Sequence, residues 1–282
     1  FPYTTLFRPL AGGADTLVTV GGVQTNHGRL TAAAAAKAGL ACTLVLDGAR
    51  PEKLSGNLLL DCLLGASLVY TDGRSTSAVI EETLAALRAA GRAPYFIPEG
   101  GSNAVGSAGY LAMVPELLAQ ADSLPVPPAR LVCTMGSLGT FAGLWLGARA
   151  FGAPFSVTGV AVNPTTGYTR EKAAALVNEM SAAYGLDIAA APEDMDIIYA
   201  DAAHDYAGPG YNVPDAKTRG AVELLARTEG IFLDPCYTAK SFRGFCDIAR
   251  ELDGGAIFVH TGGTPALWTQ EHLDAFAADY WN

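Results

Sequence analysis

The sequence predicts an α/β fold built on parallel sheets, and three observations carry that prediction. Short apolar runs alternate with helix-like patterns along nearly the whole 282-residue chain, which is typical of parallel strands joined by crossover helices. The apolar runs are almost continuous, as expected for strands that are covered on both faces. Several of them lead into polar, glycine-rich loops. Open parallel sheets bind ligands at the carboxyl ends of their strands, so we expect the functional site in these loops.

The elements follow in order along the chain. We expect strands at residues 16–20, 42–46, 67–70, 94–97, 130–134, 156–162 and 256–259. We expect helices at residues 27–39, 77–91, 138–151, 170–184, 214–228, 239–251 and 264–276. The stretch PVPPAR at residues 125–130 is the clearest linker-like segment and a candidate junction between two lobes.

Composition and charge exclude several classes of protein. The net charge of −10 argues against a nucleic-acid partner, which would favour a basic face. No apolar run reaches the length of a membrane span and no signal-peptide pattern is visible, so we expect a cytoplasmic protein with no membrane partner. The five cysteines are dispersed, without a CxxC or HxxxH cluster. This pattern indicates reduced thiols and no metal site.

Two of the loops contain residues that suit anion binding. The first, GGVQTNHGR at residues 21–29, precedes an alanine-rich helix, and free N–H groups there can hold a phosphate or a carboxylate. The second, GSLGT at residues 136–140, opens a helix directly after a buried strand and combines two glycines with two hydroxyl groups. From the second loop alone, an ordinary helix cap is the better-supported interpretation.

The other candidate residues also have ordinary structural explanations when each is taken singly. Asn26 and His27 suit a helix cap, and His260 suits a turn. Tyr211 and Tyr237 suit the core, with their hydroxyl groups satisfied. A functional site is favoured by co-occurrence, because polar loops follow one predicted strand after another and one of them has the geometry of a phosphate cradle.

Six motifs, in chain order, resemble those of the D-cysteine desulfhydrase and aminocyclopropane-carboxylate deaminase family. Its members are pyridoxal-phosphate enzymes of the tryptophan synthase β-like fold, fold type II. The resemblance extends from about residue 11 to about residue 276. The motifs are GGVQTNHGRLTAAAAAKAGL, IPEGGSNAVGSAGYLA, GSLGTFAGL, GPGYNVP, LLARTEGIFLDPCYTAKSF and FVHTGGTPALW.

The resemblance implies a fold of two lobes, each an open twisted parallel sheet with crossover helices, and pyridoxal 5′-phosphate as cofactor between them. We expect the large, cofactor-binding lobe at residues 9–39 and 121–282, and the small lobe at about residues 40–120. The family is usually homodimeric. A small amino acid and a second copy of the chain are therefore the expected partners.

The resemblance also assigns cofactor contacts. The resemblance implies that the GSLGT loop binds the phosphate group of the cofactor. The residues of that loop are Gly136, Ser137, Leu138, Gly139 and Thr140. Asn26 matches the asparagine that meets the ring hydroxyl of the cofactor. Thr261 is a candidate partner of the pyridine nitrogen, and Thr238 is expected near it.

Substrate contacts are assigned in the same way. Thr25, Asn26 and His27 match residues that hold the substrate carboxylate, although the family more often has serine at the first position. Tyr211 and Tyr237 match two active-site tyrosines that face the substrate, and these are the predicted catalytic residues.

The start of the sequence departs from the family pattern. Family members hold the cofactor as a Schiff base on a lysine upstream of the GGVQ strand, whereas the lysines of this sequence are at positions 37, 53, 172, 217 and 240. We interpret residues 1–8, FPYTTLFR, as an adapter-derived artefact joined to a chain that lacks its N-terminal segment. We therefore expect the chain as written to bind cofactor weakly and to turn over poorly.

The implied reaction is β-elimination on a small amino acid, with D-cysteine giving pyruvate, sulfide and ammonia. An aminocyclopropane-carboxylate deaminase has glutamate and glutamine where this sequence has Thr238 and His27, so the desulfhydrase pattern is favoured. An L-cysteate sulfo-lyase is a closer rival, because the segment from Asn26 to residue 35 resembles that subgroup and Arg29 would then help to accommodate a sulfonate. A non-catalytic cofactor-binding homologue is the remaining alternative.

Overall fold

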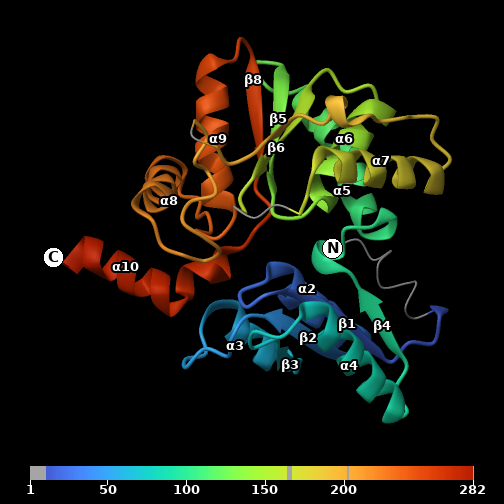
Figure 1. Cartoon of the computed structure of the whole chain (residues 1–282). Coiled ribbons are helices and arrows are strands. Elements are labelled where there is room, and N and C mark those ends of the chain that lie inside the picture. The colour runs from blue at the N-terminus through green and yellow to red at the C-terminus, as the bar shows by residue number, and fades with distance from the viewer. Residues whose placement is uncertain (1–10, 164–166, 202, 282) are drawn as a thin grey trace. The chain divides into compact units, whose positions relative to one another are not determined.

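The structure, a computed structural model, describes residues 11–163, 167–201 and 203–281. These residues form two compact units, each with its own parallel sheet (Figure 1). The first unit ends at Gly101 and also includes Trp268–Gln270, and the second unit contains Ser102–Leu267 and the chain from Glu271 onward. The predicted α/β class with parallel strands is confirmed. The segment interpreted as an artefact, residues 1–8, lies outside the described residues.

The first unit is built on a four-stranded sheet in the order β3-β2-β1-β4. Its strands are β1 (Thr16–Gly22), β2 (Ala41–Asp47), β3 (Ser67–Tyr70) and β4 (Pro94–Ile97). Its helices are α2 (Asn26–Ala38), α3 (Gly56–Leu63) and α4 (Thr76–Ala89). Because β1 pairs with both β2 and β4, the loop from β1 to α2 leaves the middle of the sheet, where open sheets bind ligands.

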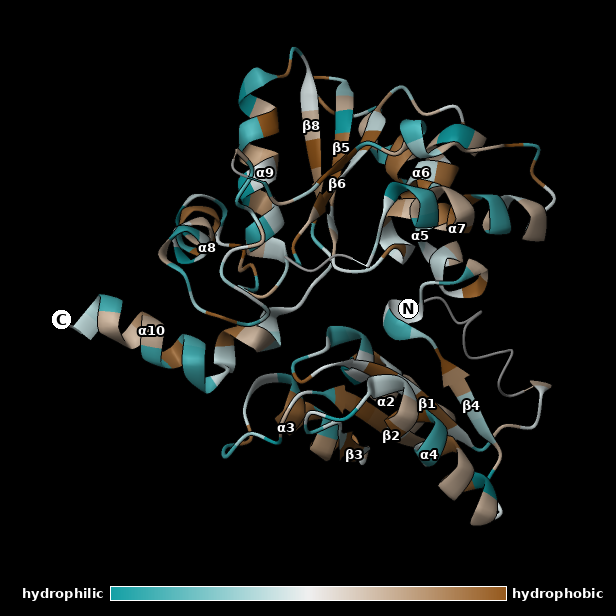
Figure 2. Ribbon diagram, in the orientation of Figure 1, coloured by the Kyte–Doolittle hydropathy of each residue, from teal (hydrophilic) through white to brown (hydrophobic). Residues whose placement is uncertain are grey.

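Different helices cover the two faces of this sheet, because side chains alternate along each strand. Leu17 and Leu44 are buried together with Leu58 of α3. Val18 and Val45 are buried on the other face, against α4. Both faces are therefore apolar, which explains the near-continuous apolar runs and the brown strands of Figure 2.

The second unit contains a four-stranded parallel sheet in the order β7-β6-β5-β8. Its strands are β5 (Pro128–Met135), β6 (Ser156–Ala161), β7 (Ile197–Ile198) and β8 (Gly255–Val259). On one face lie α5 (Ala104–Ala121), α6 (Gly139–Ala150) and α7 (Arg170–Ala183), and on the other lie α8 (Ala216–Glu229) and α9 (Thr238–Glu251) (Figure 1). The central strand β5 ends in the GSLGT loop, just as β1 ends in the GGVQTNHGR loop in the first unit.

Helices α5 and α6 pack closely because glycines of α6 leave room for the backbone of α5. A Cβ atom at Gly143 would lie 2.5 Å from the carbonyl oxygen of Ser107. A Cβ atom at Gly147 would lie 2.9 Å from the carbonyl oxygen of Leu111. Both distances are below van der Waals contact, so only glycine allows this approach. It fixes the start of α6, and with it the GSLGT loop, against α5.

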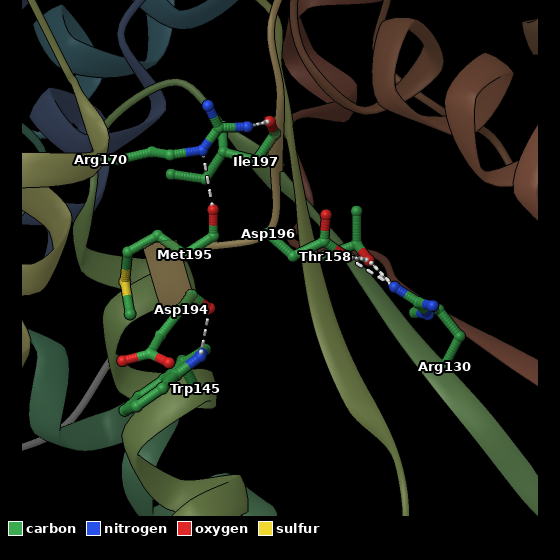
Figure 3. Close-up of polar contacts among 8 residues, drawn as sticks. All are labelled: Arg130, Trp145, Thr158, Arg170, Asp194, Met195, Asp196 and Ile197. Carbon is green, nitrogen blue, oxygen red and sulfur yellow. Dashed lines mark hydrogen bonds and ion pairs between the residues drawn. The ribbon is translucent and has the colours of Figure 1, made fainter. Parts of the chain in front are cut away.

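The short edge strand β7 is held to the sheet by side chains of its neighbours (Figure 3). Arg130 of β5 donates to Asp196 Oδ2 at 2.6 Å and to Thr158 Oγ1 at 2.9 Å. Thr158 of β6 also donates to Asp196 Oδ2, at 2.6 Å. Arg170 donates to the backbone carbonyls on either side of Asp196, at 3.0 and 2.9 Å. These bonds compensate for the few ladder hydrogen bonds of a two-residue strand.

Several elements differ from the prediction. Helices α3 and α5 and strand β7 were not predicted. The IPEGGSNAVGSAGYLA motif enters α5 at Ala104, where Asn103 Oδ1 accepts from the N–H of Gly106 at 2.8 Å. The helix expected at residues 264–276 is divided into a 3-10 helix, Thr264–Trp268, and α10 (Gln270–Trp281). The division falls at Trp268–Gln270, which belong to the first unit.

The boundary between the units also differs from the expected lobes. The segment from β1 to α2 belongs to the first unit, because β1 is central in its sheet, and α5 belongs to the second, because it packs on α6. The chain passes between the units at Gly101, not within residues 125–130. That stretch instead leads into β5, where Pro128 already pairs with Gly255 of β8.

Three features of the described residues concern the membrane, metals and the cysteines. No described helix is both long and apolar enough to cross a membrane. No group of three or more His, Cys, Asp or Glu side chains in this part of the chain is placed to hold a metal ion. All five cysteines are free.

Candidate active site

The N-terminal end of α2 has the features of an anion-binding site. Thr25 is the N-cap residue, and its Oγ1 accepts from the N–H of Gly28 at 3.1 Å. Close packing requires glycine at position 21, near the end of β1, because a Cβ atom at Gly21 would lie 2.5 Å from Thr25 Oγ1. Within the described residues, the N–H groups of Asn26 and His27 have no partner, and the first turn has no acidic side chain. Such free N–H groups suit a carboxylate.

His27 lies in this turn as a neutral imidazole. The Thr19 hydroxyl donates to the carbonyl oxygen of Ile97 at 2.8 Å, so its 2.7 Å contact with His27 Nε2 requires Nε2 to be the donor. Burial lowers the pKa of His27 to about 4. The ring therefore carries no charge at pH 7, and His27 offers a carboxylate its backbone N–H rather than a positive side chain.

The GSLGT loop leads into α6, whose N-terminal end has no side-chain cap and no acidic residue in its first turn. The N–H of Gly139 donates to Ser102 Oγ at 3.1 Å, and a Cβ atom here would lie 3.1 Å from Ser107 Oγ. The Ser107 hydroxyl is buried and lacks a partner among the described residues. Ser137 and Thr140 add two hydroxyl groups to the same loop. Small residues, hydroxyl donors and an uncapped helix end are what a phosphate requires.

The two predicted tyrosines lie together beside this loop. Tyr237 donates from its hydroxyl to that of Tyr211 at 3.1 Å, and the two rings meet edge to face with centroids 5.7 Å apart. A Cβ atom at Gly136 would lie 3.0 Å from the Tyr237 ring, so glycine lets the loop approach it. Burial raises the pKa of Tyr211 well above its usual range. Tyr211 is therefore protonated at neutral pH, and its hydroxyl also interacts with the Cys236 side chain.

Asp234, which was not predicted as a site residue, organises the start of α9. Its Oδ2 accepts from the N–H groups of Cys236 and Tyr237 at 2.9 and 2.7 Å. Its Oδ1 accepts from the N–H and the hydroxyl of Thr238 at 2.8 and 2.7 Å. Burial raises the pKa of Asp234, and these hydrogen bonds oppose the rise. The sequence signal was an Asp-Pro pair just before a helix start, a pattern in which aspartate binds backbone N–H groups.

The loop after β8 holds Thr261 beside a structural histidine. His260 Nδ1 accepts from the N–H of Gly262 at 3.0 Å, so Nε2 carries the hydrogen and donates to the carbonyl of Phe232 at 3.0 Å. His260 thus has the turn role that its ordinary explanation predicts. Thr261 is exposed, whereas the Thr238 hydroxyl is already bonded to Asp234. Of the two threonines, Thr261 is the one whose hydroxyl has no hydrogen-bond partner among the described residues.

The predicted site residues thus fall into two groups, one in each unit. The first unit holds Thr25, Asn26 and His27 at the start of α2. In the second unit, the GSLGT loop follows β5, Thr261 follows β8, Tyr237 and Thr238 are at the start of α9, and Tyr211 lies between β7 and α8. Prediction missed Asp234, Ser102 and Ser107, because a serine or an aspartate has no distinctive spacing until its partners are known.

Comparison with known proteins identifies the family. The model of the pyridoxal-phosphate dependent enzymes matches residues 5–262. The chain belongs to this family. Pyridoxal 5′-phosphate is accordingly its cofactor, as the motifs predicted. The second unit fits the phosphate group of this cofactor, because α6 is uncapped and the buried Ser107 hydroxyl lacks a partner among the described residues.

Relatives within this family are similar over most of the chain. A D-cysteine desulfhydrase of Klebsiella pneumoniae subsp. pneumoniae is 39% identical over 269 residues, and one of Yersinia enterocolitica is 37% identical over 269 residues; each alignment covers 92% of this chain and 79% of the relative. A Pyrococcus abyssi protein provisionally named 1-aminocyclopropane-1-carboxylate deaminase is 35% identical over 264 residues, 92% of this chain and 77% of the relative.

Solved structures agree with this assignment. The crystal structure of an ACC deaminase homologue superposes with a TM-score of 0.84 at 32% identity, covering 97% of this chain and 81% of the other. O-ureido-L-serine synthase superposes with a TM-score of 0.62 at 19% identity, covering 98% of this chain and 85% of the other, which shows a common fold only. The chain is therefore an enzyme of the pyridoxal-phosphate dependent family with the fold of the deaminase homologue.

Proposed function

We propose that this pyridoxal-phosphate dependent enzyme is a lyase that eliminates sulfide from D-cysteine. One D-cysteine and one water give one pyruvate, one hydrogen sulfide and one ammonia: the Cα–H and Cβ–S bonds break, and water then displaces the nitrogen. When bound, the cofactor supplies the electron sink for the pair left by the Cα–H bond. The two relatives named D-cysteine desulfhydrase support this substrate.

The observation that carries this choice is the environment of Thr238. Its side chain is fully buried, donates from its hydroxyl to Asp234 Oδ1 at 2.7 Å, and accepts from the Asp234 N–H at 2.9 Å. The deaminase pattern has glutamate at this position. An ionised glutamate has no hydrogen to donate to Asp234, whose carboxylate holds Tyr237 in place. The local network is thus suited to a hydroxyl group, which supports the desulfhydrase over the deaminase.

The proposed site gives each group one task. The N–H groups of Asn26 and His27, in the turn where Thr25 caps the N–H of Gly28, bind the substrate carboxylate, and the Asn26 side chain contacts the ring hydroxyl. The GSLGT loop binds the phosphate. Thr261 pairs with the pyridine nitrogen, and a hydroxyl leaves that nitrogen less protonated than a carboxylate would, which suits elimination. Tyr211 and Tyr237, joined through their hydroxyl groups, face the substrate.

Arg29 bears on the L-cysteate alternative, because a sulfonate requires a cation. Arg29 Nε donates to Asn57 Oδ1 at 2.9 Å, and the buried Asp61 carboxylate attracts the same guanidinium. These contacts engage Arg29 within the first unit. They support a thiol substrate over a sulfonate.

We also propose that the enzyme is a cytoplasmic homodimer. The motifs support the dimer, and the free cysteines and the amino-acid substrate support the compartment. Light scattering of the purified enzyme at several concentrations tests the dimer, and a mass near twice that of one chain is expected.

A panel of three substrates separates the candidate functions. The enzyme is expressed from its complete natural reading frame, supplied with pyridoxal 5′-phosphate, and offered D-cysteine, L-cysteate or 1-aminocyclopropane-1-carboxylate in separate assays. We expect sulfide and pyruvate from D-cysteine as the fastest reaction. Sulfite from L-cysteate, or 2-oxobutanoate from the cyclopropane, as the fastest product would replace the proposal by that alternative. No keto acid from any substrate would favour the non-catalytic homologue.

A further inference from the structure

We propose that Asn57 is a positioning residue that fixes the side-chain amide of Asn26, so that Asn26 presents its NH₂ group, and not its oxygen, to the cofactor. The inference rests on the proposed contact between Asn26 and the ring oxygen of pyridoxal 5′-phosphate. Asn57 lies in α3, 31 residues after Asn26. No motif of the sequence pointed to it.

The orientation of the Asn57 amide is fixed by two partners, one of which can only donate and one of which can only accept a hydrogen bond. Arg29 Nε, which can only donate, contacts Asn57 Oδ1 at 2.9 Å. The backbone carbonyl of Gln24, which can only accept, contacts Asn57 Nδ2 at 2.8 Å. The oxygen and nitrogen of this amide are therefore assigned by chemistry. Asn57 Nδ2 has one hydrogen left, and it points at Asn26.

That second hydrogen fixes the neighbouring amide. Asn57 Nδ2 lies 2.8 Å from the Asn26 side chain, and the atom that it meets has to be an acceptor, which is Oδ1. The Asn26 NH₂ group is consequently turned away from Asn57. No hydrogen bond from that NH₂ group to the described residues is present, so both of its hydrogens remain available to a ligand.

The surroundings make this arrangement rigid. Asn57 is fully buried, and its N–H donates to Gln24 Oε1 at 2.8 Å, so every polar atom of its side chain and its amide N–H is satisfied. Behind it lies buried Asp61, whose carboxylate attracts the Arg29 guanidinium when it is ionised. A flip of the Asn57 amide would point its NH₂ group at Arg29 and its oxygen at the Gln24 carbonyl, which is unfavourable at both ends.

The consequence concerns the charge at the cofactor ring. An amide NH₂ group stabilises an ionised or hydrogen-bond-accepting ring oxygen, whereas an amide oxygen would repel it. Asn57 thus decides whether Asn26 presents a hydrogen or an oxygen to the cofactor. Asn57 acts through Asn26 and is not expected to contact the ring itself. Its role is to position Asn26, with Arg29 and Asp61 as the support.

The test compares the binding of two probes, pyridoxal 5′-phosphate and its 3-deoxy analogue, which lacks only the hydroxyl oxygen attached to the pyridine ring. The proteins are the complete wild-type enzyme and its variants Asn26→Ala, Asn57→Asp and Asn178→Asp. Asn57→Asp keeps the shape but has no hydrogen for Asn26, so Asn26 turns its NH₂ group inward and its oxygen toward the ring. Asn178→Asp is the matched control, since Asn178 is also an amide bonded at both ends, to Ala190 in the second unit.

We expect wild type and Asn178→Asp to prefer pyridoxal 5′-phosphate over the analogue, and Asn57→Asp to lose about ten- to a hundredfold of that preference. Damage to the fold would weaken both probes equally and leave the preference unchanged. If Asn26→Ala loses the preference while Asn57→Asp keeps it, the positioning role is wrong and the proposed contact of Asn26 stands. If Asn26→Ala keeps the preference, the proposed contact itself is wrong, and the inference falls with it.

Discussion

At the scale of single residues, the carboxylate end of the proposed site works through neutral groups. His27 donates from Nε2 to Thr19, and burial lowers its pKa to about 4, so it does not change charge near neutral pH. If the α2 N–H groups bind the substrate carboxylate, the KM for D-cysteine should show no inflection near pH 6.5, where an ordinary histidine titrates. Steady-state kinetics at intervals between about pH 5.5 and 7.5 measure this.

The matched variant is His27→Gln, which keeps an N–H donor for Thr19 and cannot titrate. It should show the same flat KM profile as wild type. A wild-type KM that rises as the pH passes 6.5, together with a flat profile in His27→Gln, would mean that a charged imidazole binds the carboxylate.

Asp61 gives the first unit a pH-dependent stability. It is fully buried, neither carboxylate oxygen has a hydrogen-bond partner among the described residues, and burial raises its pKa to about 7 despite the opposing charge of Arg29. Between its ordinary pKa near 4 and its pKa of about 7, the folded chain holds a proton that the unfolded chain has released. This group therefore makes the free energy of unfolding fall as the pH rises through that window.

Asp61→Asn should remove that dependence. The difference in unfolding free energy, variant minus wild type, should grow in favour of the variant by on the order of 2 kcal/mol between pH 5 and pH 8. Urea unfolding of both proteins at the two pH values measures it, and the histidines cancel in the difference. An equal difference at both pH values would contradict a raised pKa for this carboxyl.

At the scale of elements, the loop that carries Tyr211 is held by a buried lysine of α9. Lys240 is fully buried, and its Nζ donates to the carbonyl of Gly210 at 2.7 Å, next to Tyr211. Asp215, at the end of the loop, attracts the same ammonium. Lys240→Met should cost about 2–4 kcal/mol of stability, because it leaves the carbonyl unpaired and the partly buried Asp215 carboxylate less compensated.

Hydrogen exchange and urea unfolding check this expectation. Exchange at residues 206–215 should accelerate in Lys240→Met. The control is Lys217→Met on α8, whose exposed Nζ is 3.6 Å from Asp205 and should matter by less than about 0.5 kcal/mol. Unchanged exchange in the loop of Lys240→Met would mean that the lysine does not hold Tyr211 in place.

The contact between α5 and α6 gives a second prediction for an element. Gly143→Ala places a Cβ atom 2.5 Å from the Ser107 carbonyl oxygen, so it should destabilise by about 1–3 kcal/mol. Gly220→Ala in α8 meets nothing within 4 Å and should stabilise by about 0.5–1 kcal/mol through helix propensity. Thermal unfolding of both variants provides the comparison, and the same sign for both would contradict the close packing.

The elements that sequence patterns predicted are those with a strong period. The near-continuous apolar runs located β1, β2, β5 and β6, because both faces of these strands are buried. Helix α5 was missed because its first turns are rich in glycine and serine and it contains Pro115, features typical of loops. Strand β7 is held by Arg130 and Arg170, and no local pattern encodes such contacts.

The candidate site, like the fold, was predictable from the sequence only in part. Its motif residues could be proposed from the sequence because loops at strand ends carry recognisable glycines and hydroxyl groups. Asn57, Asp234 and Lys240 were not found, since each acts through one buried hydrogen-bonding partner or more that only the fold brings near. The unit boundary was misplaced because a proline-rich stretch marks a turn, whereas strand pairing decides which segments form one sheet.

At the scale of the whole molecule, both units contain the same arrangement of strand, loop and helix. A central parallel strand, β1 or β5, ends in a glycine-containing loop, and the helix that follows offers N–H groups at its N-terminal end. We assign a carboxylate to the first helix end and a phosphate to the second. Both are anions held chiefly by backbone groups and hydroxyls, which agrees with an acidic chain that has few lysines and arginines.

The stoichiometry of products from D-cysteine tests the central proposal most directly. The complete enzyme with pyridoxal 5′-phosphate is given D-cysteine, and sulfide, pyruvate and ammonia are quantified in the same reaction over time. We predict that the three products appear together in equal amounts. Absence of sulfide and pyruvate, while the same preparation releases sulfite from L-cysteate or 2-oxobutanoate from the cyclopropane, would contradict it.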